Sequence, residues 1–337
     1  MRVLVVNAGS TSLKLAVVDD DGAAQVIESL ADVPDAVGAV GHRVVHGGLR
    51  FRKPVLVDDD VERELESLVE LAPLHNAPAL EAIRSARLAL PDAPHVAVFD
   101  TAFHATLPEE AYTYPLPLRL RDEVGIRRFG FHGLSVEWAA SQVDVRRLVV
   151  CHLGGGSSVT AVLGGRSIDT SMGFTPLDGV PMATRAGAVG PGILLHLLRI
   201  GAGKGDLDRL LEHESGLLGV SGTSGDVRVL ETSDDPRATL ALVVFARGVA
   251  KWVAGAATVL GGLDALVFTG GIGENSPGVR AGVCERLEVL GVALDAEANA
   301  TAEPDCDVHA AASRVRIAVV RAREELVIAQ AVRGLVL

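Results

Sequence analysis

Cysteine is scarce in this sequence of 337 residues, which contains only Cys151, Cys284 and Cys306. Their odd number and wide spacing give neither a disulfide framework nor the ligand spacing of a zinc site. Because a reducing compartment is the default for such a chain, we expect a cytoplasmic protein. Aromatic residues are also few, at 4%. The core must therefore consist mainly of Val, Leu, Ala and Ile, and the Val content favours strands.

Long uncharged hydrophobic runs are absent as well. The longest candidate, residues 239–268, is interrupted by Arg247, Lys251 and Asp264. No uncharged apolar stretch reaches the roughly 18 residues expected of a transmembrane helix. The apolar run near the start ends at Asn7 and is too short for a signal peptide. We therefore expect no membrane association.

Positive charge is in deficit, with 31 Lys and Arg against 43 Asp and Glu and a net charge of -12. This balance argues against nucleic-acid binding, which needs clustered Lys and Arg. A few arginines inside a cleft can still bind a phosphorylated small molecule, because nearby charges dominate the local field. The content of hydrophobic residues, 48%, is typical of a globular protein, and the length allows two domains.

The sequence contains one structural plan twice. An apolar strand at residues 2–6, a loop of small residues, a strand at 13–18 and a turn are matched by 148–151, 154–158, 159–163 and Gly164-Gly165. Such self-similarity indicates an internal repeat. Elsewhere, helical patterns alternate with strands such as 96–99 and 265–268, which is typical of the α/β class. We expect two similar domains around a central cleft, with the boundary near Arg147.

Three glycine-rich loops each follow an apolar strand, at residues 7–12, 154–158 and 270–275. Glycine lets the backbone approach a ligand closely, and successive N–H groups can bind an anion. Each loop alone could be an ordinary turn. Three of them, two in repeat-related positions, favour binding of nucleotide phosphates. The sequence lacks the P-loop motif, and the third loop lacks the dinucleotide spacing.

A second group of polar residues is not needed for turns. Arg43 lies between apolar residues, His75 lies in an expected loop, Asp100 ends a strand, and His132 lies between aromatic and glycine residues. Arg185 adds a second arginine. Phosphoryl transfer uses guanidinium groups to stabilise negative charge and carboxylates to orient Mg²⁺. Each residue alone could be structural. A metal hydrolase stays open as an alternative, although HExxH and HxH spacings are absent.

Nine segments, in this order, resemble the acetate kinase family: VLVVNAGSTSLK, GHRVVHGG, APLHNAP, VFDTAFH, FGFHG, HLGGGSS, DTSMGFTPLDG, TGGIGEN and EEL. The resemblance covers nearly the whole chain. It implies the duplicated actin-like ATPase fold of sugar kinases, Hsp70 and actin. It also implies an N-terminal domain at 1–147, a nucleotide-binding domain at 148–325 and a helix at about 326–337 that packs back on the first domain.

The resemblance further implies a homodimer that uses Mg²⁺, or Mn²⁺ in its place, with ATP and ADP. The implied catalytic residues are Asp100, Arg43, Arg185, His132 and His75. The implied carboxylate site is formed by Arg43, Val45, Leu74 and Pro176, and the implied metal-associated residues are Asn7 and Glu324. The implied nucleotide site contains Ser10, Ser12, Lys14, His152, Gly154, Gly155, Gly156, Asp226, Arg228, Gly270, Gly271, Ile272, Gly273 and Asn275.

The sequence departs from the family at a few places. The segment between Lys14 and Arg43 is shorter than usual, and Gly155 and Val227 stand where the family has Asn and Phe. The implied reaction is reversible transfer of a phosphoryl group from ATP to acetate by direct in-line attack. Propionate or butyrate as substrate, another donor such as pyrophosphate, an ATP-driven conformational module and a degenerate regulatory relative remain alternatives.

Overall fold

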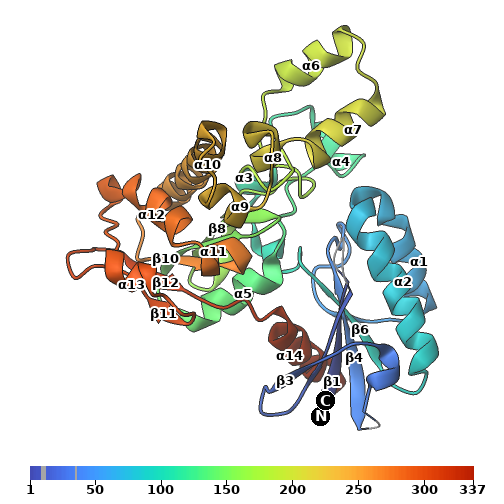
Figure 1. Ribbon diagram of the computed structural model, residues 1–337. Helices are drawn as coiled ribbons and strands as arrows, with labels where there is room; N and C mark the ends of the chain where they lie inside the picture. Colours follow the sequence, from blue (N-terminus) through green and yellow to red (C-terminus); the bar gives the residue numbers. More distant parts are fainter. Residues whose placement is uncertain (9–12, 35) are drawn as a thin grey trace.

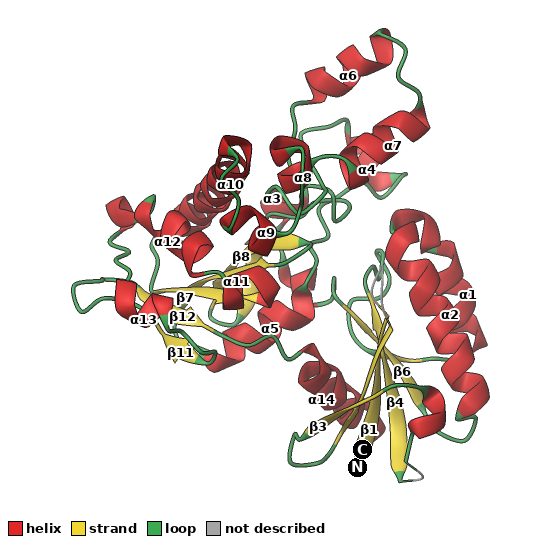
Figure 2. Ribbon diagram, viewed as in Figure 1, coloured by secondary structure: helices red, strands yellow, loops and turns green. Residues whose placement is uncertain are grey.

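The computed structural model describes residues 1–8, 13–34 and 36–337, with residues 73 and 74 described by their backbone alone (Figure 1). Ser10 and Ser12 of the expected phosphate loop therefore lie outside the described residues, as does the side chain of Leu74. The described chain forms two lobes, each built on one sheet with helices against it (Figure 2).

The first sheet has the strand order β3-β2-β1-β4-β6-β5. Its strands are β1 (Arg2–Ala8), β2 (Leu13–Val18), β3 (Ala24–Ile27), β4 (Val37–Val44), β5 (Val55–Leu56) and β6 (His95–Phe99). β1, β4 and β6 run parallel, whereas β1 and β2 form an antiparallel pair. Because parallel strands end on the same side, the residues that close β1, β4 and β6 meet at one edge of the sheet.

The second sheet repeats this plan with the order β11-β12-β10-β7-β8-β9. Its strands are β7 (Arg147–Leu153), β8 (Ser157–Leu163), β9 (Arg166–Thr170), β10 (Ala265–Thr269), β11 (Cys306–Asp307) and β12 (Arg316–Val319). β7 pairs antiparallel with β8 and parallel with β10, as β1 does with β2 and β4. The expected duplicated, actin-like α/β fold is thereby confirmed.

Helices cover both faces of the first sheet. α2 (Pro73–Ala89) and α1 (Asp59–Ser67) pack on one face, and α14 (Glu324–Val336) packs on the other. α14 lies directly against β4 because Gly41 has no side chain; a Cβ there would lie 2.5 Å from Ile328 Cγ2. The last helix of the chain therefore returns to the first sheet, and its first residue, Glu324, lies near that sheet's carboxyl edge.

The second sheet is covered by α5 (Gly133–Gln142) on one face and by α10 (Pro236–Leu260) and α12 (Pro277–Glu285) on the other. The remaining helices are α3 (Glu109–Tyr112), α4 (Leu118–Asp122), α6 (Pro191–Arg199), α7 (Lys204–His213), α8 (Gly216–Ser221), α9 (Val227–Glu231), α11 (Gly270–Asn275) and α13 (Ala296–Ala300). Short 3-10 turns span Leu30–Asp32, Val69–Leu71, Phe103–Thr106 and Glu288–Leu290. α5 also contacts α14, which joins the two lobes.

Among the described residues, α10 is the one helix long and apolar enough to cross a membrane. Its buried residues, such as Phe245, Val249 and Val253, belong to the largest core cluster of the second lobe. Length and apolar composition are shared by membrane helices and by helices in the core of folded domains, so this feature by itself is weak evidence for a membrane span.

Two local predictions were wrong. His75 was expected in a loop but lies in the first turn of α2, which begins at Pro73, a residue suited to the first helical position because it lacks an N–H. Residues 270–275 were expected as a loop but form α11, which follows β10 at once. Gly270, at φ +78°, makes this sharp turn from strand to helix possible.

Candidate active site

Four polar side chains from the first sheet and α14 form a connected group, here called the Arg43 network: Asn7, Arg43, Asp100 and Glu324. Arg43 donates to both oxygens of Asp100, from Nε at 3.0 Å and from Nη2 at 2.6 Å. Its Nη1 donates to Asn7 Oδ1 at 3.1 Å, and Asn7 Nδ2 donates to Glu324 Oε2 at 3.1 Å. These residues come from the ends of β1, β4 and β6 and from the start of α14, as the parallel arrangement of the strands requires.

The Arg43 network holds two carboxylates around one guanidinium. Asp100 is fully buried, and burial raises the pKa of its carboxyl although the Arg43 charge opposes this. Burial would also raise the pKa of Glu324, but the charge of Arg43 and the Asn7 hydrogen bond leave it below its usual value. Glu324 is therefore ionised at neutral pH, as a ligand for a hard cation must be.

His132 and His152 stack at a centroid distance of 4.2 Å, and each is held by a buried serine. His132 Nδ1 lies 3.0 Å from Ser158 Oγ, and His152 Nδ1 lies 2.8 Å from Ser135 Oγ. Ser135 belongs to α5, which His132 precedes, and Ser158 lies on β8 opposite His152. The two contacts therefore cross and fix the start of α5 against the β7–β8 hairpin.

The backbone at His132 is unusual. Its φ of +57° is the one positive value at a non-glycine residue in the described chain, and such strain commonly marks functional sites. Gly133 donates to the backbone oxygen of Asp100 at 3.1 Å, and a Cβ on Gly133 would lie 2.0 Å from that oxygen. The turn is thus pressed against Asp100. Burial and the neighbouring His152 charge lower the pKa of His132 well below its usual value, so its ring is neutral at pH 7.

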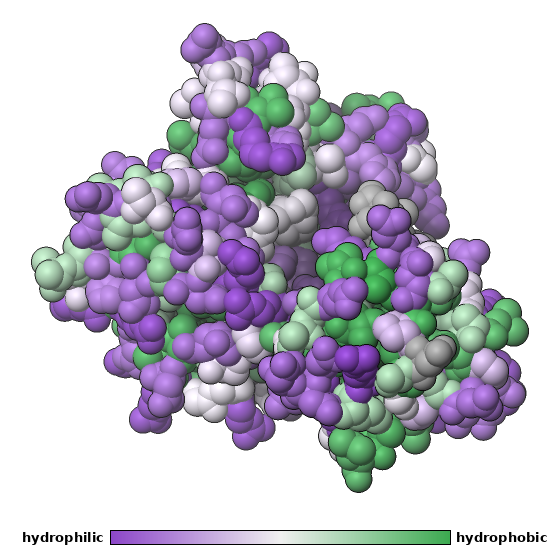
Figure 3. Space-filling model, turned by 60° about the horizontal axis from the view of Figure 1, so that its bottom comes forward, coloured by the Kyte–Doolittle hydropathy of each residue, from purple (hydrophilic) through white to green (hydrophobic). Residues whose placement is uncertain are grey.

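Arg185 lies on the other side of the site, after β9. Its Nε pairs with Glu212 Oε2 at 3.0 Å, and its Nη2 lies 3.4 Å from His75 Nε2. Burial and the Arg185 charge lower the pKa of His75 to about 4, so His75 is also neutral at pH 7. The contact between Arg185 and His75 joins the two lobes, and Figure 3 shows the surface hollowed between them.

Gly156 lies where His132 and Arg185 converge. A Cβ on Gly156 would be 3.3 Å from His132 Nε2 and 3.6 Å from Arg185 Nη1. Because Ser158 holds Nδ1 of His132, Nε2 is the atom left to face this space. The absence of a side chain at Gly156 therefore keeps a neutral imidazole and a guanidinium open to a ligand.

A cavity of about 880 Å³ lies in the second lobe beside these groups. It brings together seven of the expected nucleotide residues: Gly154, Gly155, Asp226, Arg228, Gly271, Ile272 and Asn275. Asp226 and Arg228 form an ion pair of 2.6 Å at the solvent-exposed rim. The size suits a nucleotide, since ligand cavities commonly measure about 300–1,000 Å³.

Among the described residues, the other expected nucleotide residues do not line this cavity. A Cβ on Gly270 would be 3.2 Å from His152 Nε2, so this glycine borders the histidine pair. Gly273 is buried within α11. Lys14 lies opposite Asn7 on β2, with an exposed side chain.

Of the residues expected to form the acyl pocket, the structure describes the side chains of Val45 and Pro176 but not that of Leu74. Val45 is buried in an apolar cluster with Phe129, Phe131, Met172 and Met182. Pro176 is partly buried in the segment that follows β9. Val45 directly follows β4 and lies two residues after Arg43 in the sequence.

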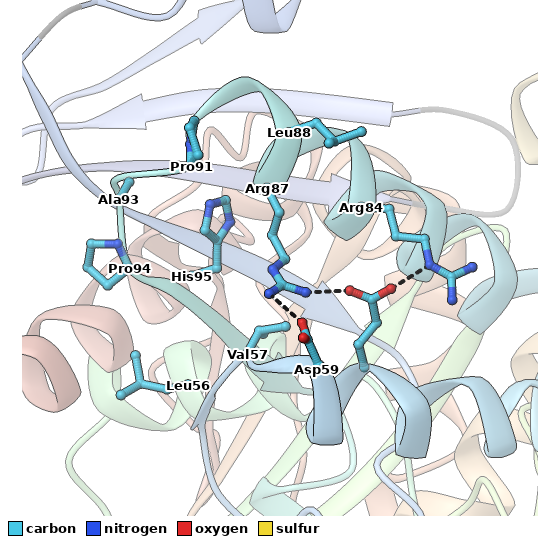
Figure 4. A pocket seen from close by; sticks show the side chains of 11 residues that line it. Leu56, Val57, Asp59, Arg84, Arg87, Leu88, Pro91, Ala93, Pro94 and His95 are labelled. Carbon is cyan, nitrogen blue, oxygen red and sulfur yellow. Dashed lines mark hydrogen bonds and ion pairs between the residues drawn. The ribbon is translucent and has the colours of Figure 1, made fainter.

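A second cavity, of about 660 Å³, lies at the outer end of α2 (Figure 4). Its arginines are already neutralised, because Arg84 and Arg87 both donate to Glu62 and Arg87 also donates to Asp59. No unpaired positive charge is thus available to a phosphate there. The cavity beside Gly154 and Gly271 is the better candidate for a nucleotide.

Sequence reasoning did not single out Ser135 and Glu212, which hold the site in place, and it did not find the partner of Ser158. Ser158 belongs to the glycine-rich loop and its hydroxyl was an evident donor, but its partner His132 is distant in sequence. Nothing in the sequence relates Glu212 to Arg185 or Ser135 to His152, since these pairs form only in the folded chain.

Comparisons with known proteins agree with this geometry. The model of the acetokinase family matches residues 29–330. An acetate kinase from Synechococcus sp. is 47% identical over 310 residues, covering 89% of this chain and 77% of its own. An acetate kinase from Pseudarthrobacter chlorophenolicus is 44% identical over 378 residues and covers 98% of both chains. A propionate kinase from Escherichia fergusonii is 46% identical over 325 residues, with coverage of 93% and 79%.

Solved structures show the same relationship. A propionate kinase from Francisella tularensis superposes with a TM-score of 0.91 at 35% identity, covering 99% of both chains. An acetate kinase from Porphyromonas gingivalis gives 0.88 at 32% identity, covering 100% of both. Relatives above 30% identity that cover most of each chain leave no doubt about the relationship, and the chain belongs to the acetokinase family.

Proposed function

We propose that this protein is an acetate kinase that reversibly transfers the γ-phosphoryl group of ATP to acetate, giving acetyl phosphate and ADP. The observation that carries the proposal is that the neutral His132 and Arg185 face one space at Gly156, beside a nucleotide-sized cavity, and that the charges of both Arg43 and Arg185 act on His132. Negative charge spreads over the equatorial oxygens during phosphoryl transfer, and fixed guanidinium and N–H donors stabilise it.

The nucleotide is assigned to the cavity between Gly154 and Asn275, with its base near the Asp226–Arg228 rim. The glycine loop at 154–156 then carries the phosphates toward His132. This direction is supported by Gly156, which adjoins His132 Nε2 and Arg185 Nη1. His152 Nε2, near Gly270, supplies a further donor. Ser10, Ser12 and Lys14 are proposed to complete the phosphate site from the first lobe.

The carboxylate substrate is assigned to Arg43 and Arg185, with its methyl group toward Val45, Leu74 and Pro176. Support comes from the apolar cluster around Val45, two residues from Arg43. Acetate is ionised at pH 7, so its oxygen can attack phosphorus without a general base. Asp100 is held by two hydrogen bonds from Arg43, and it orients that guanidinium without acting as a nucleophile.

The donor set around Asn7 and Glu324 fits Mg²⁺, or Mn²⁺ in its place. Both side chains offer oxygen atoms, and the lowered pKa of Glu324 keeps it ionised. Among the described residues, no three His, Cys, Asp or Glu side chains are grouped as a complete metal cage. Mg²⁺ is usually held by one or two carboxylates together with substrate phosphates and water. Bound there, it would neutralise phosphate charge.

Each nearby residue has a proposed part in the transfer. His132, neutral and held at Nδ1 by Ser158, donates from Nε2 to the phosphoryl group. His75 supports Arg185 through the 3.4 Å contact. Because these residues come from both lobes, closure of the lobes would bring the substrates together and exclude water.

The wider biology is also part of the proposal. We infer a cytoplasmic homodimer that binds neither nucleic acid nor membrane, with the domain division at residues 1–147 and 148–325 and the last helix packed on the first domain. The acidic composition and the scarcity of cysteine support this. Exposed apolar residues on and around α6, such as Ile193, Leu195 and Ile200, offer a surface for a second copy.

Propionate is the second candidate substrate, because relatives of similar identity are named propionate kinases. Butyrate would need a still larger pocket. One additional methylene changes the free energy of binding in an apolar pocket by only about 1–3 kcal/mol, so the pocket alone does not decide between these acids.

Acyl-hydroxamate formation tests the proposal. The protein is incubated with ATP, Mg²⁺ and hydroxylamine, and acetate, propionate and butyrate are compared. We expect product with all three and the highest kcat/KM for acetate. If acyl hydroxamate forms but kcat/KM is highest for propionate, propionate would replace acetate as the proposed substrate. ATP hydrolysis without any acyl hydroxamate would refute the proposed activity.

A further inference from the structure

One side chain bridges the nucleotide cavity and the segment that leads to Glu324. Glu274 Oε1 accepts a hydrogen bond from the backbone N–H of Gly270 at 3.0 Å and another from that of Ala322 at 2.9 Å. Gly270 is the first residue of α11, and Ala322 lies two residues before Glu324. A single carboxylate oxygen thus joins two chain segments that are 52 residues apart in sequence, as the residue numbers give.

Both segments lead to proposed ligand-binding groups. From α11, Gly271, Ile272 and Asn275 line the 880 Å³ cavity. In the other segment, Glu324 is part of the Arg43 network: it accepts a hydrogen bond from Asn7 and pairs with Arg43 at 3.4 Å. A shift of α11 that breaks the Glu274 contact would therefore also remove one of the hydrogen bonds that hold the backbone leading to Glu324.

The backbone at Glu274 is held in place by Arg280. Arg280 is almost fully buried and donates from Nη1 to the backbone oxygens of Gly273 and Glu274, both at 2.9 Å. Its Nε donates to Asn299 Oδ1 at 2.7 Å. The end of α11 is thereby anchored to α12 and α13, so the backbone at Glu274 is held by the core of the second lobe.

We propose that Glu274 is a positioning residue that couples nucleotide binding to magnesium binding. The inference rests on the proposed function, since it takes the cavity as the nucleotide site and Glu324 as a magnesium-associated residue. Coupling between two binding sites is reciprocal. If nucleotide binding orders α11 and, through Glu274, strengthens magnesium binding at Glu324, then magnesium binding must strengthen nucleotide binding by the same factor. Glu274 itself touches neither ligand.

The test measures this coupling directly by calorimetry. The Kd of ADP is determined with and without Mg²⁺, and the ratio of the two values is the coupling factor. We expect Glu274→Ala to lower this factor by at least about fivefold, the lower end of typical allosteric couplings. Glu274→Asp should behave similarly, because its shorter side chain cannot reach both N–H groups. Glu274→Gln should keep the wild-type factor, because its amide oxygen can accept both hydrogen bonds.

Glu285→Ala is the matched control. Glu285 lies on the neighbouring α12, is exposed, and pairs only with the adjacent Arg286, so its loss should leave the coupling factor unchanged. Folding of each variant is checked by urea unfolding. If Glu274→Ala fails to fold, the comparison of Glu274→Asp with Glu274→Gln still decides.

The outcomes separate the two proposals. Wild-type coupling in folded Glu274→Asp or Glu274→Ala protein would overturn the role of Glu274 and leave the proposed function standing. Failure of the wild-type protein to bind ADP would overturn the proposed function, and this inference with it. Loss of coupling in the Asp and Ala variants with retention in the Gln variant would support the inference.

Discussion

Removal of the Arg43 side chain should lower both the stability of the fold and the turnover. The stability falls because an ion pair is lost, and the turnover falls because a guanidinium is missing from the active site. Asp100 is fully buried and Glu324 is 14% exposed, and Arg43 pairs with both, at 2.6 and 3.4 Å. Arg43→Ala leaves the buried carboxylate of Asp100 and the partly buried carboxylate of Glu324 without their cation. Loss of one partner from a buried ion pair typically costs about 3–5 kcal/mol in the free energy of unfolding. Turnover should fall by about 10³–10⁵, as when a transition-state arginine is removed.

A second substitution distinguishes these effects. In the double variant Arg43→Ala/Asp100→Asn, the buried group at 100 is uncharged, so at least about 1 kcal/mol of stability should return. Turnover should not return, because the guanidinium is still missing. Arg84→Ala is the control: Arg84 is 46% exposed and pairs at the surface, where such pairs contribute about 0–1 kcal/mol.

Urea unfolding and the acyl-hydroxamate assay measure the two quantities on the same preparations. The reasoning would be refuted if Arg43→Ala unfolded at the wild-type urea concentration. It would equally be refuted if the double variant regained wild-type turnover, because the arginine would then serve the fold alone.

Three further predictions follow from single positions. Gly156→Ala should lower kcat without a change in melting temperature, whereas Gly334→Ala, in open space on α14, should leave kcat unchanged; equal kcat values would contradict the role of Gly156. Val45→Ala should raise kcat/KM for propionate relative to acetate by about 10-fold or more, and an unchanged ratio would remove Val45 from the acyl pocket. Burial lowers the pKa values of His104 and His152 to about 4, whereas the unfolded value is 6.5. The unfolded state therefore takes up protons first as pH falls, and each histidine should cost up to about 3 kcal/mol between pH 6.5 and 4. Urea unfolding across this range checks the slope, and a flat profile would show that these rings protonate in the folded state.

The repeated fold was predictable because strand, glycine-rich loop and strand leave a clear pattern twice in the sequence. β4 was not recognised, although it carries Arg43. Its sequence VGAVGHRV contains two glycines and two basic residues, and this hides the apolar pattern. The glycine at 41 is required by the close approach of α14, from the opposite end of the chain. β4 is therefore stabilised by tertiary packing, and the local sequence alone does not indicate a strand there.

The residues of the site also fall into those that the sequence predicted and those that it did not. Arg43, Asp100 and the histidines stood out because turns do not need them, whereas Glu324 was implied only by the family resemblance. The structure brings Arg43, Asp100 and Glu324 together. Their supports could not be found from the sequence, since Ser135, Glu212 and Glu274 are ordinary surface-type residues until the chain folds. α11 was predicted wrongly because a run of glycines suggests a loop, whereas in the folded chain Arg280 donates hydrogen bonds to the carbonyl oxygens near the end of this helix.

The stereochemical course at phosphorus tests the central claim most directly. The account holds that the carboxylate attacks the γ-phosphoryl group of ATP in one step, with no phosphorylated side chain. ATP made chiral at the γ-phosphorus with oxygen isotopes is converted to acetyl phosphate, and the configuration of the product is determined. The account predicts inversion. Retention would require two displacements through a phosphorylated residue and would contradict it.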